Sequence, residues 1–153
     1  MAKVKPISDI EAHLGYWLRT VSNAVSQSFA RNVEAEGVTV AEWVFLRMLY
    51  DVESIAPSQL AERMGMTKGA ISKLADRLVE KNLVSRDAKP DGKRGQTLML
   101  KPAARELVPR LAELADRNDA MFFGGLSPEE RGELERLLRL IARERGLSDI
   151  PVS

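Results

Sequence analysis

Apolar side chains recur at steps of three and four residues through most of the chain, which is the spacing of amphipathic helices. The first such segment begins at Ser8, which has capping-box spacing to Glu11, and runs to Gly37. Its apolar positions are Ile10, Leu14, Trp17, Leu18, Val21, Val25, Phe29 and Val33. A helix of about 28 residues far exceeds the average of about 11–12, so its apolar stripe must pack against more than one partner.

Three more helices are predicted in the next part of the chain. Thr39 and Glu42 form a second capping box and open an almost entirely apolar, buried helix that reaches about Val52. A short helix follows and is broken by Gly65, and Thr67 is a good N-cap for the next helix. The inward residues of these last two helices are predicted to be Leu60, Ala61, Met64, Ile71, Leu74, Ala75, Leu78 and Val79, and Asn82 suits a left-handed C-terminal position.

Residues 83–87 and 96–100 alternate polar and apolar side chains, as two half-buried strands do. The sequence AKPDGKRG between them is rich in turn formers and predicts a hairpin, with a further edge strand around Ile55. A helix is predicted from Pro102 to Gly124, bent or disturbed by Pro109, and a last helix follows the capping box at Ser127.

This order predicts a mostly α fold with a small β-hairpin wing. Residues 1–38 are expected to form an N-terminal dimerisation helix, residues 39–101 a winged helix-turn-helix, and residues 102–153 the C-terminal dimerisation helices of one compact subunit. The two ends carry amphipathic helices with no place in the small central core, so we expect them to pack against each other and against a second copy, as a homodimer.

Composition narrows the function. The 153 residues include no cysteine and one histidine, His13, so we expect no metal site, no cofactor and no catalytic residues, and the protein is not predicted to be an enzyme. No apolar run approaches the length of a membrane span and the N-terminus lacks a secretory apolar core, which predicts a cytoplasmic protein without a membrane partner.

Positive charge is concentrated between Ser58 and Lys101. This stretch has ten basic and five acidic residues, a net charge of +5 in a chain whose formal total is +1. A basic helix-turn-helix pattern predicts double-stranded DNA as the partner. The expected contacts are Thr67, Lys68, Gly69, Ser72, Lys73 and Arg77 on the recognition helix and Lys89, Asp91, Lys93 and Arg94 on the wing, with Arg94 inserted in the minor groove.

The segments LAERMGMTKGAISKLADRLVEKNLVSR and PDGKRGQTLMLKPAARELVPRL resemble the MarR family of bacterial transcriptional regulators. Arg86-Asp87, Asp91, Arg94 and Leu100 match its signature; the two residues between Asp91 and Arg94, Lys101 in place of Thr and Ala104 in place of Gly depart from it. The resemblance implies a homodimeric repressor that reads a pseudo-palindromic operator with its recognition helices in successive major grooves. A small aromatic or phenolic ligand would release it.

The resemblance also implies a ligand site between the dimerisation helices and the winged domain. His13, Tyr16, Trp17 and Arg19 would supply aromatic walls and a cation or donor for a carboxylate or phenolate, with Trp43 and Phe45 opposite. The alternative is that Trp17 packs in the dimer core and His13 is a partly exposed helix residue. The alternative function is a winged-helix protein-interaction module without specific DNA binding.

Overall fold

The computed structural model describes residues 4, 6–88, 95–148 and 150–151, and it is built from helices and one hairpin. A 3₁₀ turn, η1, spans Ile10–Ala12. The helices are α1 (Leu14–Glu34), α2 (Val40–Tyr50), α3 (Pro57–Met64), α4 (Lys68–Glu80), α5 (Pro102–Phe123) and α6 (Pro128–Glu144), and the strands are β1 (Val84–Ala88) and β2 (Gln96–Leu100). This order confirms the predicted fold class.

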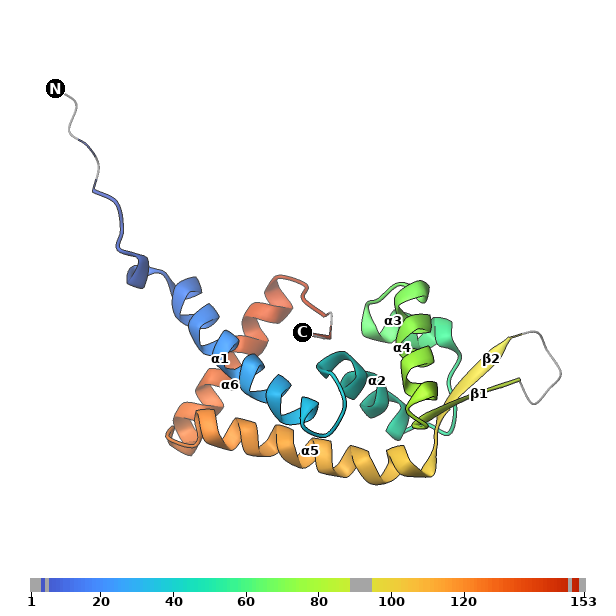
Figure 1. Ribbon diagram of the computed structural model, residues 1–153. Helices are drawn as coiled ribbons and strands as arrows, with labels where there is room; N and C mark the ends of the chain where they lie inside the picture. Colours follow the sequence, from blue (N-terminus) through green and yellow to red (C-terminus); the bar gives the residue numbers. More distant parts are fainter. Residues whose placement is uncertain (1–3, 5, 89–94, 149, 152–153) are drawn as a thin grey trace.

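The long α5 connects two groups of elements (Figure 1). α2, α3, α4 and the hairpin gather at one end of α5, and α1 and α6 lie at the other. α1 packs along α5, and α2 packs against both α1 and α5. The winged helix-turn-helix is therefore attached to the terminal helices through α2 and α5.

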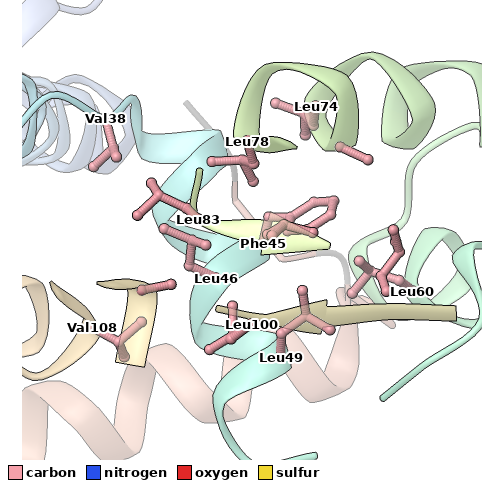
Figure 2. Close-up of a cluster of buried hydrophobic side chains, with 14 of the residues drawn as sticks. Val38, Phe45, Leu46, Leu49, Leu60, Leu74, Leu78, Leu83, Leu100 and Val108 are labelled. Atoms are coloured by element: carbon pink, nitrogen blue, oxygen red, sulfur yellow. The ribbon is translucent and has the colours of Figure 1, made fainter. Parts of the chain in front are cut away.

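One apolar core holds the winged part together. Phe45, Leu46 and Leu49 of α2 are fully buried and meet side chains from α3, α4 and both strands (Figure 2). Val108 and Leu111 extend the same cluster along α5. Burying side chains of this size stabilises the fold by about 1.5–3 kcal/mol each, so the core fixes the position of α4, whose apolar stripe is part of it.

The turn between α3 and α4 has the predicted helix break at Gly65 and the predicted N-cap at Thr67. Gly65 adopts a left-handed conformation (φ 64°) at the end of α3, where a side chain would be strained. The Thr67 hydroxyl then accepts a 3.1 Å hydrogen bond from the Ala70 N–H and caps α4. At the other end of α4, Asn82 has the expected positive φ of 62°.

The hairpin is antiparallel, with Val84 opposite Leu100 and Ala88 opposite Gln96. The predicted edge at Ile55 is an isolated bridge to Leu98, with backbone bonds of 3.0 Å and 2.8 Å in the two directions. Ile55 and Leu98 are both buried, so this bridge ties the base of the wing to the segment between α2 and α3.

The predicted start of the first helix is wrong. Ser8 and Glu11 form no capping box; a 3₁₀ turn ends at Ala12, and His13 is extended (φ −94°, ψ 128°) before α1 begins at Leu14. Helical stability in proteins comes mostly from tertiary packing, and Ile10 and Leu14 are 67% and 88% exposed. The capping pattern alone is therefore insufficient where the apolar stripe has no partner within the subunit.

Two smaller expectations also need correction. Val79 is 40% exposed, because the inward stripe of α4 follows Leu74, Ala75 and Leu78 and Val79 lies about 100° beyond Leu78 around the helix. Pro109 does not interrupt α5, which continues through it to Phe123. Pro109 is on the exposed side of α5, where water can solvate the carbonyl that its ring leaves unpaired.

Candidate nucleic-acid interface

The outward face of α4 carries the residues that were expected to contact DNA. Lys68, Gly69, Ser72, Lys73 and Arg77 are all exposed. The opposite face of α4 is buried in the core, so these side chains share one stripe that begins at the capped N-terminus of the helix. Helix-turn-helix proteins present base-contacting groups from this part of the recognition helix.

The charges of this stripe are available to a partner. Lys68, Lys73 and Arg77 make no ion pair with any other residue that the structure describes. The one acidic residue among them, Asp76, pairs with Arg86 of β1 at 2.9 Å. Within the described residues, the stripe therefore presents three cations without an ion-pair partner, and its one carboxylate is paired with Arg86 of the wing.

Arg86 joins the wing to the recognition helix, and sequence reasoning gave it no such position. Its Nη2 donates to the Ser72 carbonyl oxygen at 2.8 Å and lies 2.9 Å from Asp76 Oδ1. The same nitrogen is 3.4 Å from Ser72 Oγ. One guanidinium thus holds β1 against two successive turns of α4. The sequence signal that could have pointed to this role is the Arg86-Asp87 pair in the first strand of the hairpin.

The tip of the wing lies outside the described residues. It contains four expected DNA contacts, Lys89, Asp91, Lys93 and Arg94, which remain predictions from the sequence. The strands below the tip, β1 and β2, emerge next to α4 (Figure 1). The direction in which the wing leaves the core thus depends on the strands and on Arg86.

Lys81 was counted in the basic stretch, but it serves the fold. Its Nζ lies 2.8 Å from the Gly37 carbonyl oxygen and 2.9 Å from Oε2 of Glu42, which is 1% exposed. Burial raises the pKa of Glu42, but hydrogen bonds from Lys81 and from the Thr39 backbone outweigh it and hold that pKa below its usual 4.5. This pair, in which Glu42 is buried and Lys81 is 38% exposed, links α2 to the end of α4.

Gly69 lies at the second position of α4 in open surroundings. A methyl group added there would meet nothing nearer than Thr67 Oγ1 at 4.0 Å. The fold therefore does not require glycine at this position. A bare backbone on the exposed face of a recognition helix does allow a partner to come close.

A cavity of about 240 Å³ lies between α1, α2 and α5, and Pro151 near the C-terminus also lines it. Its apolar walls include Phe29 of α1 and Trp43 of α2, whose rings meet edge to face with centroids 6.3 Å apart. Its polar lining comes from Ser26, Asn118 and Asp119. Asn118 is 3% exposed, and its side-chain amide donates to the Val25 carbonyl oxygen at 3.1 Å.

The structure does not bring the six expected ligand residues together. Trp43 lines this cavity, but Phe45 is 0% exposed in the core. His13, Tyr16, Trp17 and Arg19 lie at the start of α1; Tyr16 and Trp17 stack edge to face at 5.1 Å, and Trp17 Nε1 donates to the Glu11 carbonyl oxygen. The cavity meets α1 instead at residues 25, 26 and 29, about 9–24 Å further along the helix.

No helix in the described ranges is both long and apolar enough to cross a membrane. Nor do His, Asp and Glu side chains in the described ranges gather in a group that could hold a metal ion.

Comparison with known proteins identifies the family. A model of the MarR family matches residues 36–95. A protein of Thauera aromatica named for transcriptional regulation of the hcr operon is 32% identical over 132 residues, which cover 86% of this chain and 80% of that protein. An HTH-type transcriptional repressor of Mycobacterium tuberculosis is 25% identical over 88% of this chain and 96% of its own.

Solved structures share the fold over nearly the whole chain. A mutant of Escherichia coli MarR in complex with operator DNA aligns with a TM-score of 0.74 at 24% identity, covering 88% of this chain and 99% of that one. Bordetella bronchiseptica BpsR, whose DNA binding is regulated by 6-hydroxynicotinic acid, aligns with a TM-score of 0.75 at 23% identity, covering 90% and 98%. This protein belongs to the MarR family and is a transcriptional regulator rather than an enzyme.

Proposed function

We propose that this regulator is a repressor that binds double-stranded operator DNA as a homodimer, with α4 of each subunit in the major groove. The observation that carries the proposal is the exposed stripe of α4, where Lys68, Lys73 and Arg77 are free of ion pairs within the described chain. The mycobacterial relative named as a repressor supports repression rather than activation. The E. coli structure with operator DNA supports this use of the fold.

Each part of the stripe has a role set by its chemistry. The lysines are flexible point charges suited to phosphates, whereas the Ser72 hydroxyl can donate to or accept from a base edge. Thr67 places the free N–H groups of the first turn of α4 toward the phosphate backbone. Phosphate contacts fix the register of the helix, and base contacts supply discrimination.

Apolar side chains at the two ends of the chain support a homodimer. Trp17, Leu18 and Val21 of α1 are 49%, 57% and 44% exposed, and Leu138 and Ile141 of α6 are 43% and 52% exposed. Exposed apolar stripes on two amphipathic helices are costly to leave in water. A second copy would cover them and would place two α4 helices on half-sites about 34–36 Å apart.

The wing would add contacts in the flanking minor groove. Arg94 is assigned as the inserted residue, with Asp91 orienting it, and Lys89 and Lys93 as phosphate contacts, on the sequence alone. Replacing Arg94 with Ala should weaken operator binding by about 1–3 kcal/mol, measured by fluorescence anisotropy, with Lys3→Ala as a charge-matched control in the N-terminal segment. An unchanged operator affinity of the Arg94→Ala variant would show that Arg94 does not contact the DNA.

A small aromatic or phenolic effector would act from the cavity between α1, α2 and α5. A ligand there touches both the terminal helices and the winged domain, so it can favour a dimer whose α4 helices do not match the half-sites. BpsR, regulated by 6-hydroxynicotinic acid, supports this mode of control. Trp43 is the member of the expected ligand set that lines the cavity.

The experiment is a binding comparison between two duplexes of equal length. One carries the region upstream of the protein's own gene, and the other carries the same bases in scrambled order. A specific regulator should prefer the upstream duplex by at least about 10³-fold at physiological salt. A winged-helix protein-interaction module would bind both equally or not at all, and that result would replace the proposal.

A further inference from the structure

We propose that the cavity between α1, α2 and α5 selects a small ring compound that donates hydrogen bonds, neutral or cationic, and rejects aromatic carboxylates. The inference rests on the proposed effector role of this cavity and specifies the chemical class of the ligand. It differs from the sequence-based expectation, which paired a carboxylate or phenolate with His13 or Arg19. It also sets this protein apart from BpsR, whose regulator 6-hydroxynicotinic acid is an aromatic carboxylate.

The polar lining of the cavity offers acceptors. Among the described residues that line it, the polar side chains are the Ser26 hydroxyl, the Asn118 amide and the Asp119 carboxylate, and none is Lys, Arg or His. His13 and Arg19 belong to the first turns of α1 and do not line the cavity. A carboxylate ligand would thus find a like charge and no counter-ion in the wall, which disfavours its binding.

The hydrogen bond made by the Asn118 amide nitrogen shows which atom of this side chain is the unpaired acceptor. Its Nδ2 donates to the Val25 carbonyl oxygen, which can only accept, so Oδ1 is the atom left over. Oδ1 is buried and has no hydrogen-bond partner among the residues that the structure describes. A buried acceptor without a partner costs about 1–3 kcal/mol, and a ligand donor would relieve this cost if the Asn118 amide turned toward the cavity, because Oδ1 is closed to solvent in the present side-chain position.

Asp119 gives the cavity its charge. Its Oδ2 lies 3.7 Å from Nη2 of Arg131, but both side chains are more than half exposed, at 58% and 52%. An exposed ion pair at this distance is weak and screened by solvent. Asp119 can therefore still attract a cationic or hydrogen-bond-donating ligand in the cavity. Arg131 itself is not part of this cavity's lining.

The aromatic wall favours the same class of ligand. Trp43 and Phe29 are each partly exposed and stand edge to face, so a ring can pack on one while a positive group meets the other. A cavity of about 240 Å³ is at the small end for organic ligands, which limits the occupant to roughly one ring with a short substituent.

Three isosteric probes test the proposal on the full-length protein without DNA. Benzamidine is a cationic donor, benzamide is neutral and benzoate is an anion, and all three share one ring. Calorimetry should give benzamidine a Kd near about 1 mM or lower, at least about tenfold tighter than benzoate, with benzamide between them. Quenching of Trp43 in a Trp17→Phe background, which leaves one tryptophan, should report the same order.

Two matched variants locate the effect. Asp119→Asn should reduce the preference for benzamidine over benzoate by at least about threefold. Asp116 is an exposed carboxylate of α5 that does not line the cavity, so Asp116→Asn should leave the preference unchanged. Benzoate binding equal to or tighter than benzamidine would overturn the proposal. So would no binding of any probe at about 10 mM, or equal effects of the two variants.

The proposed DNA-binding function is measured separately, as preference for the upstream duplex in the absence of ligand. Specific DNA binding without discrimination among the three probes refutes the ligand class and leaves the repressor intact. Discrimination among the probes without specific DNA binding refutes the repressor and leaves the ligand class intact.

Discussion

Arg86→Ala should weaken DNA binding through the position of the wing rather than through the loss of a phosphate contact. In the structure, Arg86 Nη2 donates to the Ser72 carbonyl oxygen at 2.8 Å and pairs with Asp76 at 2.9 Å. These bonds hold β1 against α4. Without them, the wing and the recognition helix must be ordered relative to each other when DNA binds, which adds to the cost of binding.

The effect on stability should be modest. A charge-assisted hydrogen bond contributes about 1.5–3 kcal/mol, and the ion pair adds at most about 1 kcal/mol because Asp76 is 68% exposed. Arg86 Nε is buried and has no hydrogen-bond partner in the described part of the chain, which offsets about 1–3 kcal/mol of that gain. Urea unfolding of Arg86→Ala should therefore show a loss of about 1 kcal/mol with an unchanged m-value.

Salt dependence separates positioning from direct contact. Arg86→Ala should raise the operator Kd about 5–30-fold, which corresponds to about 1–2 kcal/mol, while the slope of log K against log salt stays the same. Asp76→Asn should also weaken binding, although removing a negative charge near DNA would by itself strengthen it. A slope that falls by about 0.9 in Arg86→Ala, or tighter binding by Asp76→Asn, would refute the positioning role.

Three other perturbations test separate parts of the account. Gly69→Ala should stabilise the fold by up to about 1 kcal/mol yet weaken operator binding; equal or tighter DNA binding would mean that no backbone approaches the DNA there. Because the pKa of Glu42 in the folded protein is lowered from 4.5, ionised Glu42 should stabilise the fold fully above about pH 4.5, and this stabilisation should be lost as the pH falls through the folded pKa. Glu42→Gln should flatten this decline of stability in acid-unfolding curves. Leu18→Asp should leave a 17.0 kDa monomer in sedimentation while Val79→Asp keeps the parental mass; a 17.0 kDa parent protein would refute the dimer.

Local signals predicted the central part of the fold. The capping boxes at Thr39 and Ser127, the N-cap at Thr67 and the positive φ of Asn82 all occur as expected. Each involves residues within about four positions of one another, so short-range hydrogen bonding decides it. The burial of α2 followed from its almost continuous apolar residues, and the buried face of α3 followed from helical spacing.

The start of α1 could not be predicted in the same way. The apolar spacing continues back to Ile10, but the side chains that would cover Ile10 and Leu14 are not supplied by this subunit. Pattern alone indicates where a helix can form, whereas packing decides where it is stable. The sequence contains the stripe but does not identify its partner.

Helical geometry explains why the expected ligand residues of α2 do not line one cavity in this subunit. Trp43 and Phe45 are two positions apart, so they point about 200° from each other around α2 and cannot both line one cavity. Phe45 takes the core side and Trp43 the cavity side. Asn118 was missed because its partner, Val25, is 93 residues away in sequence. Arg86 and Asp76 likewise meet only when the wing folds back onto α4.

The central claim is that the stripe on α4 binds operator DNA as part of a dimer, and the salt dependence of binding to the upstream and scrambled duplexes tests it most directly. Lys68, Lys73 and Arg77 have no ion-pair partner among the described residues, and three such cations on each of two subunits predict a linear log–log plot for the upstream duplex with a slope of about −5 or steeper. The scrambled duplex should be bound far more weakly at every salt concentration. Equal affinity for the two duplexes, or affinity that does not change with salt, would contradict the account.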